Sequence, residues 1–307
     1  MKEIISKKNL FKILFIVVLY LTVMILMGAN VIDSYIFLNI VSIGINIILA
    51  VSLNLITGFT GQFSLGHAAF MSIGAYASGI LTAKLGLPFI VGIIGAALAA
   101  AVAGLLIGIP TLRLKGDYLA IATLGFGEIV RILFLNWSYV GGAMGLNDIP
   151  RYTNWTWLFA MIVVTYLIIS NFIASYHGRA VISIKEDEIA STSMGVNTSY
   201  YKVLVFSIGA LFAGIAGALY ANYFYFIKPD SFGFMKSVDI LVIVVLGGLG
   251  SIRGSIISAI VLSLVSLSLQ GIPELRMVIY AVVLFIMMVF KPQKLVRKFM
   301  SKFRKEA

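Results

Sequence analysis

The chain has 307 residues, of which 61% are hydrophobic and 11% charged, and its mean hydropathy is +1.05. A soluble domain carries about a quarter charged residues, so this composition excludes an ordinary soluble domain. The net charge of +11 lies at the chain ends and in two polar loops, a placement typical of cytoplasmic segments that argues against nucleic acid as a partner. The absence of cysteine excludes disulfides.

Recurrent apolar runs of ~20 residues predict an all-α integral membrane protein, because the strands of a membrane β-barrel would alternate over ~10 residues. The basic N-terminus resembles part of a signal peptide, but the apolar run continues to Ala29 without an A-x-A-like site, which predicts a retained span. Ten apolar segments are expected: 10–29, 36–57, 62–83, 88–112, 118–136, 155–175, 201–227, 238–250, 255–270 and 275–290.

Two of these segments are expected to be interrupted helices. GFTGQFSLGH precedes and enters the third segment, and GGLGSIRG separates the short eighth segment from the short ninth. Glycines permit close helix packing in a membrane, and they permit breaks where the backbone is buried in protein or faces water. Gln62, Ser64 and His67 lie at the first break. His67 has no carboxylate near it in sequence, which favours a hydrogen-bonded packing residue over a ligand or a proton relay.

The distribution of Lys and Arg predicts the orientation of the ten segments. With the N-terminus inside and alternating spans, 17 basic residues fall on the inner side and 5 on the outer side, while Arg131 lies within a span. Cytoplasmic loops carry an excess of Lys and Arg, so both termini are expected in the cytoplasm. Charge inside a membrane is costly, and the i,i+3 spacing of Glu128 and Arg131 favours a structural ion pair. Lining of a permeation path is the alternative.

The longest polar stretch is GRAVISIKEDEIASTSMGVNTSYYK, residues 178–202, which the orientation places in the cytoplasm. Ser183 and Glu186 have the spacing of a capping box, so a short helix is expected to begin there, with acidic residues in its first turn and a stop at Gly195. Asn197 or Thr198 is expected to cap the next span. Ile189, Ala190 and Met194 would form an apolar side. Both a protein-binding helix and a solvated interhelical loop fit this pattern.

The chain also shows a weak internal repeat. LGHAAFMSIGAYA from Leu65 resembles IGALFAGIAGALYA from Ile208, which matches Gly66 with Gly209 and Gly74 with Gly217. LGFGEIVR from Leu124 resembles LGGLGSIR from Leu246. Duplicated halves with interrupted helices are typical of transporters. The alternative is that helices rich in Gly and Ala resemble one another by composition alone.

Signals for an enzyme are absent from the sequence. The chain has two histidines, no cysteine, no H-E-x-x-H motif, no nucleophile elbow and no G-x-x-x-x-G-K-[ST] phosphate loop. We therefore expect a protein that is not an enzyme, that binds no cofactor or metal, and that has no phosphate loop with which to bind ATP. An ion-coupled secondary carrier stays open, although Glu128 is its main candidate carboxylate.

Three stretches resemble the LivM-type permeases of branched-chain amino-acid ABC importers: SLNLITGFTGQFSLGHAAFMSIGAYASGIL (52–81), GRAVISIKEDEIASTSMGVNTSYYKVLVFSIGALFAGIAGALYA (178–221) and VVLGGLGSIRGSIISA (244–259). The resemblance implies one transmembrane permease domain over residues 1–307, a cytoplasmic coupling-helix loop at 178–200 and a basic cytoplasmic tail at 291–307. It also implies a location in the plasma or inner membrane, with contacts to lipid.

The same resemblance implies a set of partners and a substrate class. These are a LivH-like second permease, two ABC ATPase subunits that hydrolyse ATP, and an extracytoplasmic substrate-binding protein that delivers leucine, isoleucine or valine. Relatives in this broad group carry urea, amides or other amino acids, so another small polar solute stays an alternative. A membrane enzyme or scaffold is disfavoured, because no catalytic cluster is visible.

The resemblance further assigns roles to particular residues. Glu188, Ala190 and Gly195 fall near the E-A-A…G pattern of importer permeases, although the spacing is one residue longer and the trailing I-x-L-P is missing. The expected coupling residues are Arg179, Glu186, Asp187, Glu188, Ala190 and Gly195. The candidates for the permeation path are Gln62, Phe63, His67, Phe70, Glu128, Gly247 and Gly248, with Tyr76, Phe126 and Leu246 as further guesses.

Overall fold

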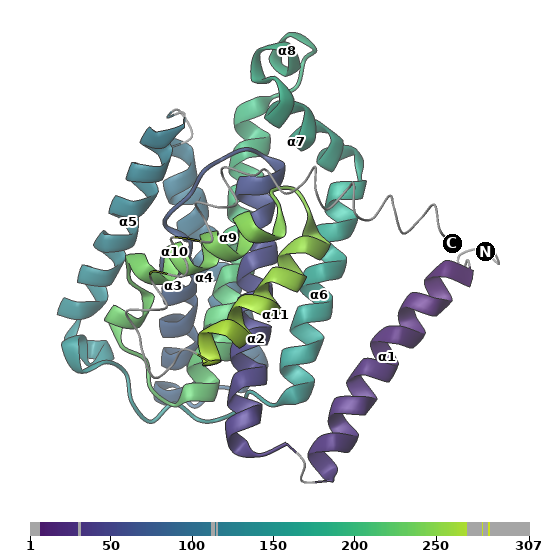
Figure 1. The fold of residues 1–307 in the computed structure, drawn as a ribbon. Helices are drawn as coiled ribbons and strands as arrows, with labels where there is room; N and C mark the ends of the chain where they lie inside the picture. Colours follow the sequence, from purple (N-terminus) through teal and green to yellow (C-terminus); the bar gives the residue numbers. More distant parts are fainter. Residues whose placement is uncertain are drawn as a thin grey trace.

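The computed structural model describes residues 7–29, 32–111, 114, 116–268, 278 and 282, and within them the chain is helical with no β-strand. The long helices are α1 (Lys7–Gly28), α2 (Ser34–Leu53), α4 (Phe89–Thr111), α5 (Asp117–Asn136), α6 (Trp155–Ala174) and α9 (Thr198–Phe224). The shorter ones are α3 (His67–Gly79), α7 (Tyr176–Glu186), α8 (Glu188–Ser193), α10 (Phe234–Gly247) and α11 (Ile252–Ser268). Figure 1 shows the body as a bundle, with α7 and α8 at one end.

Five helical segments are long and apolar enough to cross a membrane: Ser34–Phe59, Phe89–Thr111, Asp117–Asn136, Trp155–Ala174 and Thr198–Phe224. Ile16–Gly28 and Ile252–Leu267 are apolar but shorter. The structure thus confirms an all-α protein of membrane type. Nine of the ten predicted segments correspond to helices, and the tenth, 275–290, lies outside the described residues except for 278 and 282. The count of ten spans therefore stays a prediction, and the predicted basic tail, 291–307, also lies outside the described residues.

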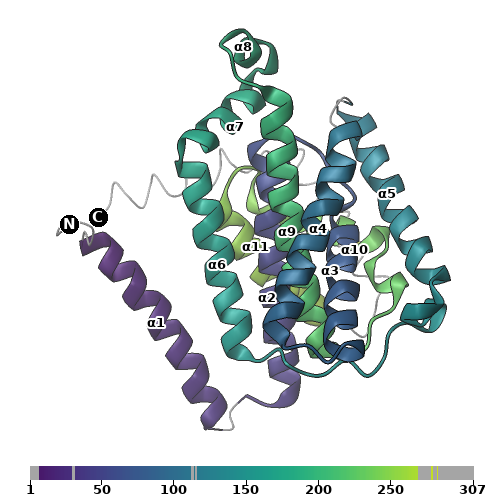
Figure 2. The same cartoon turned by 180° about the vertical axis from the view of Figure 1, so that it is seen from behind.

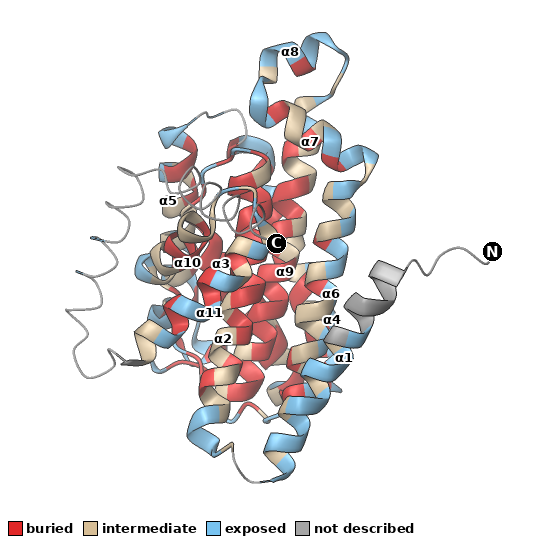
Figure 3. Cartoon of the chain, turned by 45° about the vertical axis from the view of Figure 1, so that its right-hand side comes forward, coloured by how far each residue is buried: buried red, intermediate tan, exposed pale blue. Residues whose placement is uncertain are grey.

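Helix α9 forms the centre of the core, because small residues let α2, α3 and α4 approach it closely (Figure 3). A β-carbon added at Gly217 would lie 2.0 Å from the Met71 carbonyl oxygen of α3, and one added at Gly74 would lie 2.3 Å from the Gly214 carbonyl oxygen of α9. The glycines matched by the first repeat, Gly74 and Gly217, thus both lie where α3 and α9 cross.

The second repeat match joins segments of different structure. Leu124 and Arg131 lie within α5, which continues unbroken past Gly125 and Gly127. Leu246 and Arg253, in contrast, flank a turn between α10 and α11. The difference follows from backbone conformation, because Gly248 and Gly250 have φ of +89° and +87°, values that a helix excludes and that favour glycine. The local likeness of sequence therefore does not extend to structure here.

Two breaks in the membrane helices lie at the end of the molecule that carries α7 and α8. The first break follows α2, which continues as a π-helical turn over Asn54–Phe59 before the chain runs without helix through residues 60–66. Helix α3 therefore begins at His67, five residues later than the predicted start at 62. The second break is the turn at 248–251 that separates α10 from α11. Both predicted interruptions are confirmed.

Candidate functional site

Helices α7 and α8, residues 176–193, project from the body as an arm (Figures 1 and 2). Ser175 begins the arm, since its Oγ accepts a hydrogen bond from Gly178 N at 3.3 Å. At its base α7 buries Val181 and Ile184 against the body. Arg179 lies exposed on α7, away from the tip. The sequence pattern had predicted one short helix in this stretch, and the structure has two.

The predicted capping box at Ser183 and Glu186 is wrong. Both residues lie inside α7, and the Ser183 hydroxyl donates back to the Ala180 carbonyl at 2.8 Å. Helix α8 is instead capped by Asp187, whose Oδ1 accepts from the backbone N–H groups of Ile189 at 2.9 Å and Ala190 at 3.0 Å. The physical reason is that α7 starts upstream at Ser175 and its turns already include Ser183. Asp187 has an extended backbone, which a capping residue requires.

The predicted end of the short helix is confirmed. Gly195 has a φ of +85°, and its N–H donates to the Thr192 carbonyl at 2.9 Å, while Val196 N donates to Ser191 at 3.1 Å. This closes α8 with a left-handed glycine. Asn197 then caps α9, since its Oδ1 accepts from Tyr200 N at 3.0 Å. The arm is therefore a defined helical element rather than a loose loop.

The tip of the arm exposes apolar side chains. Ile189 is 76% exposed and Met194 is 84% exposed, and Ala190 beside them is also exposed. One exposed apolar residue needs no explanation, but two large ones, on a six-residue helix and at its C-cap, give the tip an apolar surface. We refer to Ile189, Ala190 and Met194 as the tip surface.

An ion pair ties the arm to the core helix. Lys202 Nζ of α9 lies 2.6 Å from Glu188 Oε1 of α8, and Lys202 is largely buried. Because Glu188 is the first residue of α8, the pair anchors the start of the tip helix to α9, the central helix of the core. The position of α8 is thereby tied to α9.

Exchanging the two charges tests this ion pair. Glu188→Lys alone is expected to destabilise the arm by about 1.5–3 kcal/mol, because a charged hydrogen bond is lost and Lys202 loses its partner. The double exchange Glu188→Lys with Lys202→Glu restores the pair but leaves a lysine at the start of α8, where the helix dipole disfavours it by about 0.3–1 kcal/mol. Thermal unfolding should therefore show a fall in the single variant and partial recovery in the double one. Equal melting temperatures for all three proteins would contradict the pairing.

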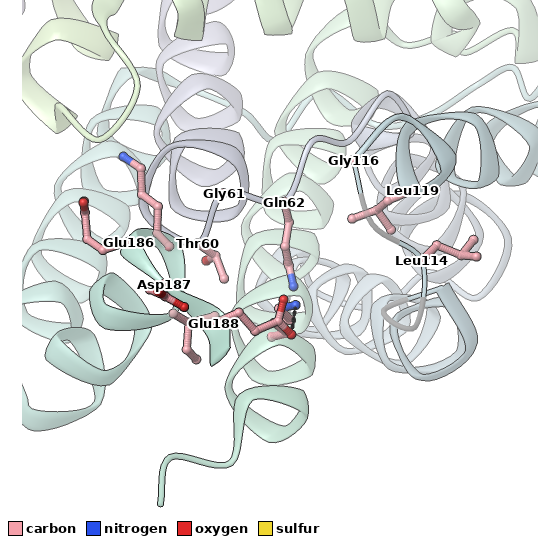
Figure 4. A pocket seen from close by; sticks show the side chains of 12 residues that line it. Thr60, Gly61, Gln62, Leu114, Gly116, Leu119, Glu186, Asp187 and Glu188 are labelled. Carbon is pink, nitrogen blue, oxygen red and sulfur yellow. Dashed lines mark hydrogen bonds and ion pairs between the residues drawn. The ribbon is translucent and has the colours of Figure 1, made fainter. Parts of the chain in front are cut away.

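A pocket of about 240 Å³ lies between the arm, the first break and the start of α5 (Figure 4). It brings Gln62 together with the predicted coupling residues Glu186, Asp187 and Glu188, and Figure 4 shows the side chains of Gln62 and Glu188 pointing toward one another. Gln62 is only 3% exposed, and within the described part of the chain neither of its amide atoms has a hydrogen-bond partner. The pocket therefore joins a residue predicted for the path to residues predicted for coupling.

A buried asparagine joins the two breaks directly. Asn54 Oδ1 accepts from the Gly250 N–H at 2.9 Å, and Asn54 Nδ2 donates to Ser255 Oγ at 2.8 Å. Asn54 and Ser255 are fully buried. Gly58 is required beside this contact, because a β-carbon there would lie 1.7 Å from Asn54 Oδ1 and 2.4 Å from Gly250 N. The first break and the second therefore form one bonded unit.

The arm lies on this unit through Lys185, in the last turn of α7. A β-carbon at Gly61 would lie 3.4 Å from Lys185 Cγ, and one at Gly250 would lie 3.6 Å from its Nζ. Both breaks thus lie within contact distance of one side chain of the arm. Asn54, Lys185 and Lys202 were not predicted as functional residues from the sequence. The available signal was an asparagine inside an apolar span, at Asn54 in AVSLNLITG.

The remaining candidates for the permeation path do not share one surface. His67 is fully buried, with its Nε2 2.8 Å from Ser52 Oγ, as expected for a packing residue. Phe70 is also buried, between the rings of Phe126 and Phe206 at 5.5 Å each. Phe63, in contrast, is 37% exposed. A path through these residues stays a prediction.

Three further candidates lie elsewhere. Gly247 is the last residue of α10, and Gly248 follows it. A β-carbon at Gly247 would lie 2.5 Å from the backbone of Gly254, so glycine at this position is explained by the tight turn between α10 and α11. The ion pair of Glu128 and Arg131 is confirmed, with Nε 2.8 Å from Oε2. Arg131 also reaches Asp230 Oδ1 at 2.9 Å, which joins α5 to the segment before α10.

Comparison with known proteins identifies relatives over most of the chain. The family described as "Branched-chain amino acid transport system / permease component" matches residues 35–289. The "High-affinity branched-chain amino acid transport system permease protein LivM" of Escherichia coli (strain K12) is 37% identical over 286 residues, which cover 82% of this chain and 67% of the relative.

More distant relatives include both permease types. The "Probable branched-chain amino acid transport permease protein LivM" of Methanocaldococcus jannaschii is 25% identical, over 82% of this chain and 90% of the relative. The LivH permease of Salmonella typhimurium is 29% identical over 245 residues, covering 70% of this chain and 78% of the relative. No solved structure matches this chain with significance.

Proposed function

Since the chain belongs to the family of permease components of branched-chain amino acid transport systems, we propose that it is a transmembrane subunit of an ABC importer for leucine, isoleucine and valine. The relatives of the LivM and LivH groups are named as branched-chain amino acid permeases, which supports this substrate class. Similarity to both groups also supports a second, LivH-like permease as the partner that completes the translocation path.

We further propose an orientation with the arm in the cytoplasm and the chain threaded through the bilayer as ten spans. The excess of Lys and Arg on the arm side supports this orientation. In this orientation both termini are cytoplasmic, and the loop between α5 and α6 faces outward with its aromatic residues. An extracytoplasmic binding protein would deliver the amino acid to that outer face.

The proposed motor is a pair of ABC ATPase subunits, which bind and hydrolyse ATP outside this chain. The single observation that carries the proposal is the exposed tip surface of Ile189, Ala190 and Met194 on an arm that is anchored to both membrane breaks. A short helix with an apolar face fits a groove on a partner. When the ATPases close, they would press on α8 and thereby bias the arm between two positions.

A chain of contacts would carry a displacement of the arm into the membrane helices. Helix α8 is linked to α9 by the Glu188–Lys202 pair, and α7 contacts Gly61 and Gly250 through Lys185. Asn54 holds the two breaks together, so both would move as one unit. A ligand or partner can shift such an equilibrium only if it makes different contacts in the two states. The proposal therefore requires that the ATP-bound motor contact the arm differently from the nucleotide-free motor.

Uptake by purified components tests the proposal. The chain is reconstituted in liposomes either alone or with the second permease, the ATPases and the binding protein. Accumulation of labelled leucine against its gradient is expected only with the full set and ATP. Uphill uptake by this chain alone, sensitive to an ionophore, would identify an ion-coupled carrier instead. Uptake of urea or an amide in place of leucine by the full set would overturn the substrate class.

A further inference from the structure

A second pocket lies inside the membrane region, between α2, α10 and α11. Its volume is about 180 Å³. Asn46, one of its lining residues, stands near the midpoint of the span Ser34–Phe59. The pocket lies apart from the arm, and none of the candidate residues named from the sequence lines it.

Charged and polar groups line this pocket at a depth where they are costly. Lys236 and Asp239 of α10 both face it, together with Asn39 and Asn46 of α2 and Ser263 of α11. Ionisable residues inside a membrane are rare and mark functional sites by default. Lys236 Nζ donates to Asn46 Oδ1 at 3.1 Å, and Asn46 Nδ2 donates to Ser263 Oγ at 3.0 Å. These bonds fix one side of the pocket.

Asn39 provides the observation that points to a ligand. The residue is only 8% exposed, and its Oδ1 has no hydrogen-bond partner among the residues that the structure describes. Buried polar atoms in proteins are nearly always paired, so each exception requires an explanation. Asn39 lines the pocket while its Oδ1 is closed to water, so a rotation of the amide as a ligand enters would pair this acceptor with a ligand N–H.

From this arrangement we infer that the pocket between α2, α10 and α11 binds a zwitterionic α-amino acid with an aliphatic side chain. Lys236 supplies a positive charge for the carboxylate. Asp239 and Asn39 Oδ1 supply acceptors for the ammonium group. Ile243 and Leu262 offer apolar contacts to the side chain.

Size and position agree with this ligand. A volume of about 180 Å³ is below the ~300–1,000 Å³ of pockets for drug-sized ligands, which suits a free amino acid rather than a peptide or a nucleotide. The pocket is bounded by α10 and α11, which are joined by the glycine turn at 248–251. Transporter sites commonly lie near the bilayer midplane beside such discontinuous helices. Asn54 and Lys185 both contact this turn at Gly250. A displacement of the arm would therefore also move the helices that bound the pocket.

The inference rests on the proposed function, because it assigns the imported solute to a site in this subunit. The chain contains no cysteine, which makes a single introduced thiol a clean reporter. Ser42 of α2 lines the pocket and is partly exposed. A Ser42→Cys variant is assembled into the complete transporter and treated with a small cationic methanethiosulfonate reagent. Ser138→Cys, exposed beyond the far end of α5, serves as the control.

Saturating leucine is expected to slow the modification of the Ser42→Cys variant at least about fivefold and to leave the Ser138→Cys variant unchanged. Asn39→Leu and Asp239→Asn should each raise the half-saturating leucine concentration for uptake at least about tenfold, as expected for a lost charged or buried hydrogen bond. Asp239→Glu should restore part of the affinity, which a purely structural defect would not.

The outcomes separate the two proposals. ATP-dependent leucine uptake by a complex whose Ser42→Cys modification is indifferent to leucine overturns the pocket and leaves the importer standing. A reagent that never reaches Ser42→Cys, or protection by sodium ions in place of leucine, also overturns it. Failure of the complex without substitutions to take up any branched-chain amino acid contradicts the proposed function itself.

Discussion

Replacing both Ile189 and Met194 with aspartate is expected to abolish ATP-driven uptake while the chain still folds in the membrane. Both side chains are exposed in the isolated chain, so the substitutions remove no internal packing. If α8 docks on an ATPase, each apolar side chain contributes about 1.5–3 kcal/mol when it is buried. Two losses together weaken docking by at least ~100-fold. The measurement is leucine uptake and leucine-stimulated ATP hydrolysis by the assembled transporter.

The control places an aspartate outside the tip surface. Ser199→Asp adds an aspartate at an exposed position in the first turn of α9, where the helix dipole favours it. This variant should transport normally. Full coupling in the double tip variant, or equal loss in the Ser199→Asp variant, would refute docking through Ile189 and Met194.

The second large effect is expected at Asn54. Asn54→Leu preserves approximate size but leaves the Gly250 N–H without its partner. The Ser255 hydroxyl loses the donor Asn54 Nδ2 and keeps its bond to the Ser251 carbonyl at 3.2 Å. One unpaired group of this kind costs about 1–3 kcal/mol, so the variant should melt at a lower temperature. Uptake should fall by more than the loss of folded protein explains, because the two breaks no longer move together.

A control for Asn54 uses the same replacement at an exposed site. Asn136 ends α5, and among the residues that the structure describes it donates only to the Ile132 carbonyl one turn earlier, at 2.8 Å. Asn136→Leu is expected to leave melting and uptake within experimental error. An Asn54→Leu protein with normal uptake would show that the bonds between the breaks are dispensable for coupling.

Hydropathy predicted the membrane helices well, because a span in lipid must satisfy its backbone internally and must be apolar along its length. The breaks were also predictable, since Gly248 and Gly250 occupy left-handed conformations that other residues avoid. The start of α3 was predicted five residues early. Its entry sequence, from Gln62 to Gly66, is apolar enough to read as helix yet is held as loop by contacts such as the hydrogen bond from Leu65 N to Thr123 Oγ1 at 3.0 Å.

The arm shows where local pattern is insufficient. Ser183 and Glu186 have the correct spacing for a cap, but α7 already extends through them from Ser175. Because Ser183 is already inside α7, α8 begins later and is capped by Asp187. The end of α8 at Gly195 was predictable, because it depends on one residue whose conformation its type determines.

The contacts that matter most for coupling join residues far apart in sequence. Asn54 meets Gly250 and Ser255 about 200 residues later along the chain, and Lys185 reaches both breaks. No periodicity or motif encodes such pairs, because they depend on how α2, α7 and α11 pack. Similar local sequence also does not guarantee similar structure. Leu124–Arg131 forms a continuous helix, whereas the similar Leu246–Arg253 contains a turn.

Photo-crosslinking from the tip of the arm tests most directly whether α8 receives the stroke of the motor. An Ile189→Cys variant, in a chain that has no other cysteine, is labelled with a benzophenone maleimide and assembled with its partners in liposomes. We predict that illumination joins residue 189 to the ATPase subunit with a yield that changes on addition of ATP, whereas a label on a Ser138→Cys variant joins neither ATPase. A tip label that reacts only with lipid or solvent, in a complex that transports leucine, would contradict a motor acting through this arm.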